Sequence, residues 1–171
     1  NHAYLNKGDL KIEREENGLN TPSFSNGAAY ADLDNDGDFD LVVNNVNMPL
    51  FVYKNNLDND TNYLKVILKG EGMNTYAIGA KLELSSKTNS YFLEQQPVRG
   101  FQSSMDNRPN FGFKEKDSLN LTVIWTSGKI THLSNIEVNK TIRLEDKDAT
   151  LPNTVAKKER SYTLFLKENG D

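Results

Sequence analysis

The sequence predicts an all-β protein, and three observations support this fold class. Short runs rich in Val, Ile, Leu, Tyr and Phe recur along the chain, and several alternate apolar with polar residues, which is the period of a half-buried strand. Clusters of Asn separate these runs, and Asn favours turns because it tolerates a left-handed backbone and bonds its own main chain. Helix signals are scarce. Short strands separated by turn signals predict a β-sandwich or barrel.

Taken in chain order, the predicted strands fall into two groups. Short strands at residues 27–31 and 41–45 lie on either side of an acidic loop. More regular strands follow at residues 63–69, 80–84, 90–95, 119–125 and 141–146. Pro152 interrupts the stretch 148–160, which we interpret as a linker with room for a short helix, and residues 161–166 are a last strand candidate.

The two groups also differ in character, which indicates two regions followed by a tail. Residues 1–58 hold the acidic loop and the densest Asn, and residues 62–146 hold the most regular strands. Residues 147–171 are predicted to be a linker and the start of a further repeat. The polar stretch 55–60 marks the boundary between the two regions. Because the first region is too short for a core of its own, we expect it to lean on the second or on missing neighbours.

We predict that residues 62–146 form an antiparallel β-sandwich of about seven strands, since alternating strands build layered cores. The apolar side chains on one face of each strand should supply much of that core. These predicted core residues are Ile67, Leu82, Leu84, Phe92, Leu121, Val123, Trp125, Ile130, Ile142 and Leu144.

Composition excludes several classes of function. The formal net charge of -4 and the lack of a basic cluster argue against nucleic acid as a partner. The absence of Cys excludes disulfides, thiolate zinc sites and cysteine nucleophiles. No stretch approaches the roughly 18 apolar residues of a membrane span, and no signal peptide is visible. With His2 and His132 as its only histidines and no nucleophile or phosphate-loop motif, the chain is predicted to have no catalytic residues and no enzymatic activity.

The most distinctive motif of the sequence is the stretch 32–40, which we call the aspartate loop. Five carboxylates in nine residues repel one another unless a counterion lies between them. Oxygen ligands at every second position suit Ca²⁺, which takes six to eight oxygens, and Gly37 at the sixth position permits the turn that folds them around one centre. The predicted ligands are the carboxylates of Asp32, Asp34, Asp36 and Asp40 and the backbone carbonyl of Asp38. A solvated acidic turn is the alternative.

The aspartate loop is not an EF-hand. That loop requires Glu at its twelfth position, where this chain has Val43, and it requires flanking helices, where this chain has predicted strands. The stretch is therefore interpreted as a calcium-binding β-hairpin. Ca²⁺ is favoured over Mg²⁺, because Mg²⁺ is rarely bound by a cage made of protein groups alone.

Residues 25–32, the aspartate loop and residues 50–56 together resemble an FG-GAP/VCBS repeat. In that family each repeat is one four-stranded blade of a β-propeller, and a DxDxDGxxD loop between the first two strands binds calcium. The resemblance covers about residues 1–56. It implies that residues 1–17 are the closing strands of a preceding blade, and that the aspartate loop belongs to a propeller-like blade fragment packed against or linked to the sandwich.

The second region resembles the ASPIC/UnbV domain, which commonly follows such repeats. The matching stretches are residues 62–66, 77–81, 99–104, 110–113, 123–125, 128–129 and 139–142. Asn110 stands where a His is usual in the family, and Thr126-Ser127 replaces a common Pro.

Together the resemblances imply a calcium-binding recognition or adhesion module at the cell surface or outside the cell, part of a larger repeat protein, whose partner is an extracellular protein or a glycan. The alternative is an accessory domain, with glycan binding as one role, of a large envelope enzyme or polysaccharide-handling system.

Four other features have competing interpretations. We interpret Trp125 as a core anchor in preference to a sugar-stacking platform, and His132 as a structural histidine. We interpret the stretch 99–104 as a tight corner between sheets in preference to a ligand-binding loop. Glu83 and Glu94 would suit a glycosidase pair only at a set separation in a cleft, so we do not favour that function.

Overall fold

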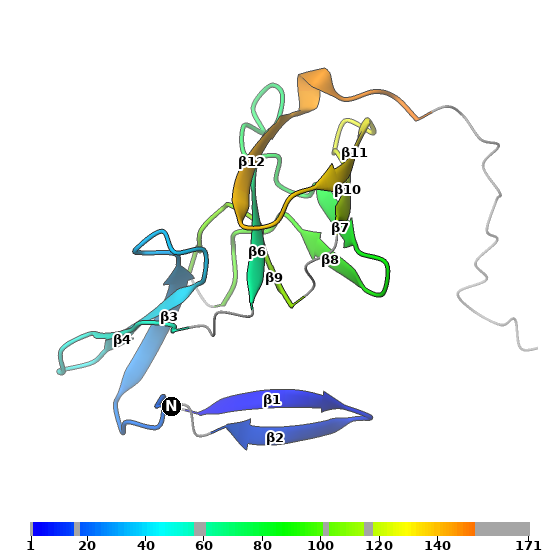
Figure 1. Ribbon diagram of the computed structural model, residues 1–171. Helices are drawn as coiled ribbons and strands as arrows, with labels where there is room; N and C mark the ends of the chain where they lie inside the picture. Colours follow the sequence, from blue (N-terminus) through cyan, green and yellow to red (C-terminus); the bar gives the residue numbers. More distant parts are fainter. Residues whose placement is uncertain (1, 16–17, 57–60, 101–102, 115–117, 153–171) are drawn as a thin grey trace, which may run out of the picture.

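The computed structural model describes residues 2–15, 18–56, 61–100, 103–114 and 118–152 (Figure 1). These residues form twelve strands, arranged in four separate sheets, and one short 3-10 helix. The all-β fold class is confirmed. The predicted strand at residues 161–166 and most of the predicted linker lie outside the described residues.

Seven strands make two sheets that share one core. These sheets form the upper part of the molecule in Figure 1. The first sheet has the order β11-β10-β7-β8, and the second has the order β12-β6-β9. The strands of the first sheet are β7 (Lys81–Ser85), β8 (Ser90–Glu94), β10 (Leu119–Ile124) and β11 (Ile130–Ile136). Those of the second are β6 (Asn62–Lys69), β9 (Asn110–Phe113) and β12 (Lys140–Glu145). We refer to these two layers as the sandwich.

The expectation of a wholly antiparallel sandwich is wrong at one pair. Strands β6 and β12 pair in parallel, from Lys140 opposite Leu64 to Glu145 opposite Lys69. Parallel neighbours need a crossover connection. Here the chain leaves β6, builds the whole of the opposite sheet and β9, and returns along the other edge of β6.

The core of the sandwich follows the predicted alternation in most strands. Of the predicted core residues, five are buried: Leu82, Leu84, Leu121, Val123 and Trp125. Ile142 and Leu144 pack against this cluster while partly exposed, and Ile130 is half-buried. The prediction for Ile67 is wrong, because Leu64, Val66 and Leu68 are the β6 residues that face the core and Ile67 points to the opposite face.

Phe92 corrects the predicted register of β8. Its side chain is 63% exposed, because Tyr91 and Leu93 are the β8 residues that pack on the core. Successive side chains of a strand point to opposite faces, so a run of three apolar residues cannot all face inward.

The remaining strands lie before residue 58. A three-stranded antiparallel sheet has the order β3-β4-β5, formed by β3 (Ser25–Ala31), β4 (Asp40–Asn45) and β5 (Phe51–Tyr53). The four-stranded blade implied by the resemblance therefore has three strands among the described residues. Strands β1 (Ala3–Gly8) and β2 (Lys11–Glu15) pair only with each other and stand apart from the other sheets in Figure 1.

The described chain ends beside the sandwich. A 3-10 turn, η1 (Asp146–Asp148), follows β12, and Thr150 then forms an isolated bridge with Ile130 at the start of β11. The expected linker thus begins as an ordered segment that joins the edges of the two sheets.

The core register gives a stability prediction. Leu82→Ala should lower the free energy of unfolding by about 2–5 kcal/mol, because Leu82 is fully buried and its truncation leaves a cavity. Phe92→Ala, a matched truncation on the next strand, should change it by no more than about 0.5 kcal/mol. Urea denaturation of both variants measures the difference. Equal losses would show that Phe92 is packed against the core after all.

Candidate metal centre

The aspartate loop connects β3 to β4 at the end of their hairpin, where Ala31 pairs with Asp40. Two residues inside it adopt a left-handed backbone, Asn35 with φ of 62° and Gly37 with φ of 100°. These are the residue types that tolerate this conformation, so the local sequence itself folds the loop back on itself.

Three of the five predicted ligands come together. Asp32, Asp34 and Asp36 each place a carboxylate oxygen within 4.8 Å of the others. Asp32 is buried and the other two are exposed. The Oδ1 atom of Asp32 is buried and has no hydrogen-bond partner, which is costly for an ionised acceptor. A hard cation held by oxygens would satisfy that atom, so this donor set fits Ca²⁺.

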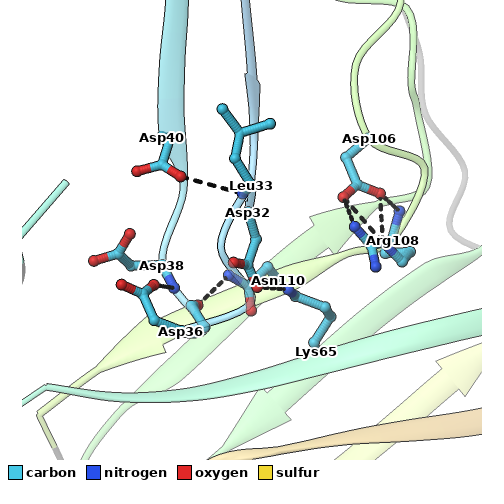
Figure 2. A network of polar contacts seen from close by, with 10 residues as sticks. Asp32, Leu33, Asp36, Asp38, Asp40, Lys65, Asp106, Arg108 and Asn110 are labelled. Atoms are coloured by element: carbon cyan, nitrogen blue, oxygen red, sulfur yellow. Dashed lines mark hydrogen bonds and ion pairs between the residues drawn. The ribbon is translucent and has the colours of Figure 1, made fainter. Parts of the chain in front are cut away.

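Asp38 and Asp40, the other two predicted ligands, lie outside this group of three. Both are buried. Asp40 closes the loop by accepting backbone hydrogen bonds, from Leu33 to Oδ2 at 3.1 Å and from Asn55 to Oδ1 at 2.9 Å. The backbone N–H of Asp38 donates to Oδ1 of Asp36 at 3.2 Å. Figure 2 shows the contacts of Leu33 with Asp40 and of Asp38 with Asp36.

Lys54, just after β5, is an internal counterion of the exposed carboxylates. Its ammonium group forms an ion pair with Asp34 and lies 3.8 Å from Oδ2 of Asp36. The hydrogen bond from Lys54 lowers the pKa of Asp34 below its ordinary value, and Asp34 in turn raises the pKa of Lys54. The Lys54 side chain is 57% exposed, so packing does not hold it in this position.

Lys65 is the counterion of the buried carboxylate. It lies on β6 between Leu64 and Val66, whose side chains face the core of the sandwich, so Lys65 points to the opposite face. There the aspartate loop covers it: its ammonium group pairs with Oδ2 of Asp32, and the two side chains are only 4% and 2% exposed. Burial of either charge alone would be strongly unfavourable, so each requires the other.

Two further contacts fix the tip of the aspartate loop on the sandwich. The side-chain amide of Asn110, on β9, donates to the backbone carbonyl of Gly37 at 2.9 Å (Figure 2). The ring of Tyr63, on β6, lies so close to Gly37 that a Cβ atom there would overlap it. Gly37 is therefore required twice, for its backbone conformation and for this close approach.

A third acid–base pair, between Arg108 and Asp106, lies in the segment before β9. Arg108 binds Asp106 through Nε at 2.8 and 2.9 Å and through Nη2 at 2.5 Å. Burial alone would raise the pKa of Asp106, but the hydrogen bonds and charge of Arg108 outweigh it and lower this pKa. The adjacent Met105 accepts a hydrogen bond from the Tyr30 amide at 3.4 Å, so this segment also contacts β3.

Sequence reasoning did not identify Lys54, Lys65 and Asn110 as part of this centre. The predicted core residue Ile67 lies on the same face of β6 as Lys65, so the predicted register placed Lys65 toward the core, whereas in the structure both face away from it. Nothing in the pattern indicated that the aspartate loop, more than twenty residues earlier, would cover it. The one available signal was the surplus of negative charge in the aspartate loop, which requires cations from somewhere.

The surroundings of Trp125, His132 and the stretch 99–104 indicate structural roles. Trp125 is buried and its Nε1 donates to Thr131 at 2.9 Å, as a core anchor should. His132 lies opposite Thr122 on the neighbouring strand, with Nδ1 3.0 Å from its hydroxyl. Val98 bridges Ser104 around Gly100, whose φ of 86° fits the predicted corner. Residues 101–102 of that stretch lie outside the described residues.

Glu83 and Glu94 are not a facing pair. On the β7–β8 ladder Glu83 lies opposite Phe92, and Glu94 lies opposite Lys81.

Comparison with known proteins supports one of the two resemblances. Residues 70–151 match the family described as ASPIC and UnbV, which covers most of the sandwich and the turn after it. No curated protein matches the chain. The resemblance of residues 1–56 to an FG-GAP/VCBS repeat stays a prediction. Among the described residues, no helix has the length and apolar character needed to cross a membrane.

The buried pair gives a second stability prediction. In calcium-free buffer, Lys65→Met should lower the free energy of unfolding by about 3–5 kcal/mol, because it leaves the Asp32 carboxylate buried without a counterion. Adding Asp32→Asn in the same chain should recover much of the loss. Lys69→Met on the same strand removes a Lys that is 51% exposed and should cost less than about 1 kcal/mol. Chemical denaturation measures the free energy of unfolding of Lys65→Met, of the double variant and of Lys69→Met. Similar effects of Lys65→Met and Lys69→Met would contradict the assignment.

Proposed function

We propose that this chain is a calcium-binding recognition module without catalytic activity, working outside the cell or at the surface of the cell envelope as part of a larger repeat protein. The aspartate loop would hold one Ca²⁺ through the carboxylates of Asp32, Asp34, Asp36 and Asp40 and the carbonyl of Asp38. The observation that carries the proposal is the convergence of three carboxylates on a buried, unpartnered oxygen of Asp32.

Charge supports a divalent cation at this place. Lys54 and Lys65 offset two of the three converging carboxylates, which leaves negative charge uncompensated, with Asp38 and Asp40 close by in the same loop. Asp32 is suited to shared use, since one oxygen binds Lys65 and the other lacks a partner. The ion would then lie in a site anchored to the sandwich.

The proposal of a recognition role rests on the family resemblances and on the lack of a catalytic constellation among the residues that the structure describes. The partner would be an extracellular protein or a glycan. The alternative, an accessory domain of a large envelope enzyme or polysaccharide-handling system, makes a different prediction about the full-length reading frame: a catalytic domain in the same frame supports it, whereas a signal peptide followed only by repeats supports a separate recognition protein.

Calcium binding is tested by calorimetry on the chain stripped with EDTA. We expect one Ca²⁺ per chain, with much weaker binding of Mg²⁺, because the loop offers a flexible oxygen cage. Asp36→Asn should lower the affinity sharply, since it removes a charged ligand. Asp9→Asn, a matched change in the β1–β2 turn, should leave it unchanged. Absence of heat and of any calcium-dependent change in thermal stability would refute the proposed ion.

Lys54 should compete with the ion. Lys54→Gln removes an ammonium group that pairs with two of the converging carboxylates, so Ca²⁺ affinity should rise by about two- to fivefold, the factor expected from one exposed ion pair. Lys69→Gln, which is distant from the loop in sequence and pairs with Glu145, is the control. A fall in affinity in the Lys54 variant would mean that this side chain shapes the site and does not oppose the ion.

Hydrogen exchange tests whether the ion orders the loop or the whole chain. In EDTA, residues 27–54 should lose protection because their carboxylates repel, while the core strands of the sandwich keep theirs. Millimolar Ca²⁺ should restore the loss. Uniform loss over the whole chain would instead show that the β3–β5 sheet and the sandwich unfold as one unit. No change anywhere would mean that the loop does not depend on an ion.

A further inference from the structure

A cleft of about 690 Å³ lies at the junction of the aspartate loop and the sandwich. One wall is the loop from Asp36 to Phe39, and another is the segment from Lys54 to Asn56. The sandwich contributes the remaining side, which includes Tyr63 and Asn110. Its size is that of ligand pockets, which occur preferentially where two parts of a protein meet.

Carboxamide groups dominate the lining of this cleft. Five asparagines line it, namely Asn55, Asn56, Asn62, Asn110 and Asn139, with Thr61 and the rings of Phe39 and Tyr63 beside them. An Asn side chain offers donors and an acceptor together, which matches the paired hydroxyl groups of a sugar.

Three of these asparagines are held in place by hydrogen bonds. Asn139 donates to Oδ1 of Asn62 at 2.9 Å, and its own Oδ1 accepts from the Tyr63 amide at 2.9 Å. Asn110 donates to Gly37 at 2.9 Å. Groups that are already ordered lose little entropy when a ligand binds, so this side of the cleft is preorganised.

Asn110 also has a buried acceptor atom without a hydrogen-bond partner. The Nδ2 atom of Asn110 donates to the Gly37 carbonyl, which determines the orientation of the side-chain amide. The remaining polar atom of the side chain is therefore the acceptor Oδ1. That Oδ1 is buried and has no hydrogen-bond partner. That atom has almost no accessible surface, so a ligand in the cleft does not reach it, and Asn110 contributes by holding the loop wall in place through Gly37.

Charge and composition narrow the ligand class. Two carboxylates, Asp36 and Asp38, and one ammonium group, Lys54, line the cleft. Even with the proposed Ca²⁺ on Asp36, the lining has one Lys and no Arg, and so lacks the cluster of basic side chains that phosphates, nucleic acids and acidic sugars require. The polar lining disfavours a lipid chain.

We propose that this cleft binds a neutral oligosaccharide. Carboxamides that line the cleft hydrogen-bond its hydroxyls. The inference rests on the proposed function in one respect: Ca²⁺ orders the aspartate loop, which is one wall of the cleft, so sugar binding depends on the ion.

The test titrates four neutral trisaccharides, maltotriose, cellotriose, mannotriose and N-acetylchitotriose, into the intact chain while its amide NMR spectrum is recorded. In saturating Ca²⁺ at least one should bind and shift the signals of residues lining the cleft, and EDTA should abolish the shifts. Asn56→Ala should weaken binding by about two- to tenfold, the effect of one hydrogen bond, because Asn56 is an exposed lining residue. Asn20→Ala, an exposed Asn outside the cleft, should leave binding unchanged.

The outcomes separate this inference from the proposed function. Calcium binding without binding of any of the four sugars overturns the inference and leaves the proposed ion in place. Failure of both overturns both. Sugar binding that is equal in EDTA, or that Asn20→Ala weakens as much as Asn56→Ala, overturns the assignment of the ligand to a calcium-ordered cleft.

Discussion

The buried ion pair between Lys65 and Asp32 is the interaction on which the arrangement of this protein depends. It joins the first residue of the aspartate loop to the central strand of the β12-β6-β9 sheet. Neither charge is stable in its buried position without the other. The pair thereby fixes where the loop lies on the sandwich, and the contacts of Gly37 with Asn110 and Tyr63 follow from that position.

This polar junction compensates for what the first region lacks. Among the described residues before Asn62, Val43 is the only apolar side chain that is buried, whereas the sandwich buries a continuous cluster. The hydrophobic effect thus stabilises the sandwich, and charge and hydrogen bonds position the β3–β5 sheet beside it. A segment held in this way responds to changes in its charge balance, such as a bound cation, more strongly than a segment held by a core.

Much of the fold and part of the candidate site could be predicted from the sequence, because both depend on local patterns. Alternation located five of the seven sandwich strands but not β9 and β11, and the spacing of Asp32, Asp34 and Asp36 identified the carboxylates that converge. The parallel pairing of β6 and β12 depends on the path of the chain between them, which no local pattern contains. The role of Lys65 could not be predicted for the same reason: its burial is caused by a segment distant in sequence.

The central claim is that Asp32 is shared between Lys65 and a calcium ion. A crystal structure grown with Ca²⁺ and measured for the anomalous signal of calcium tests it most directly. The account predicts one peak within about 2.3–2.6 Å of carboxylate oxygens of Asp32, Asp34, Asp36 and Asp40 and of the Asp38 carbonyl. Lys65 should stay bound to the other oxygen of Asp32, and Lys54 should be withdrawn. Carboxylates splayed apart with no density between them, or a Lys65 side chain released to solvent, would contradict it.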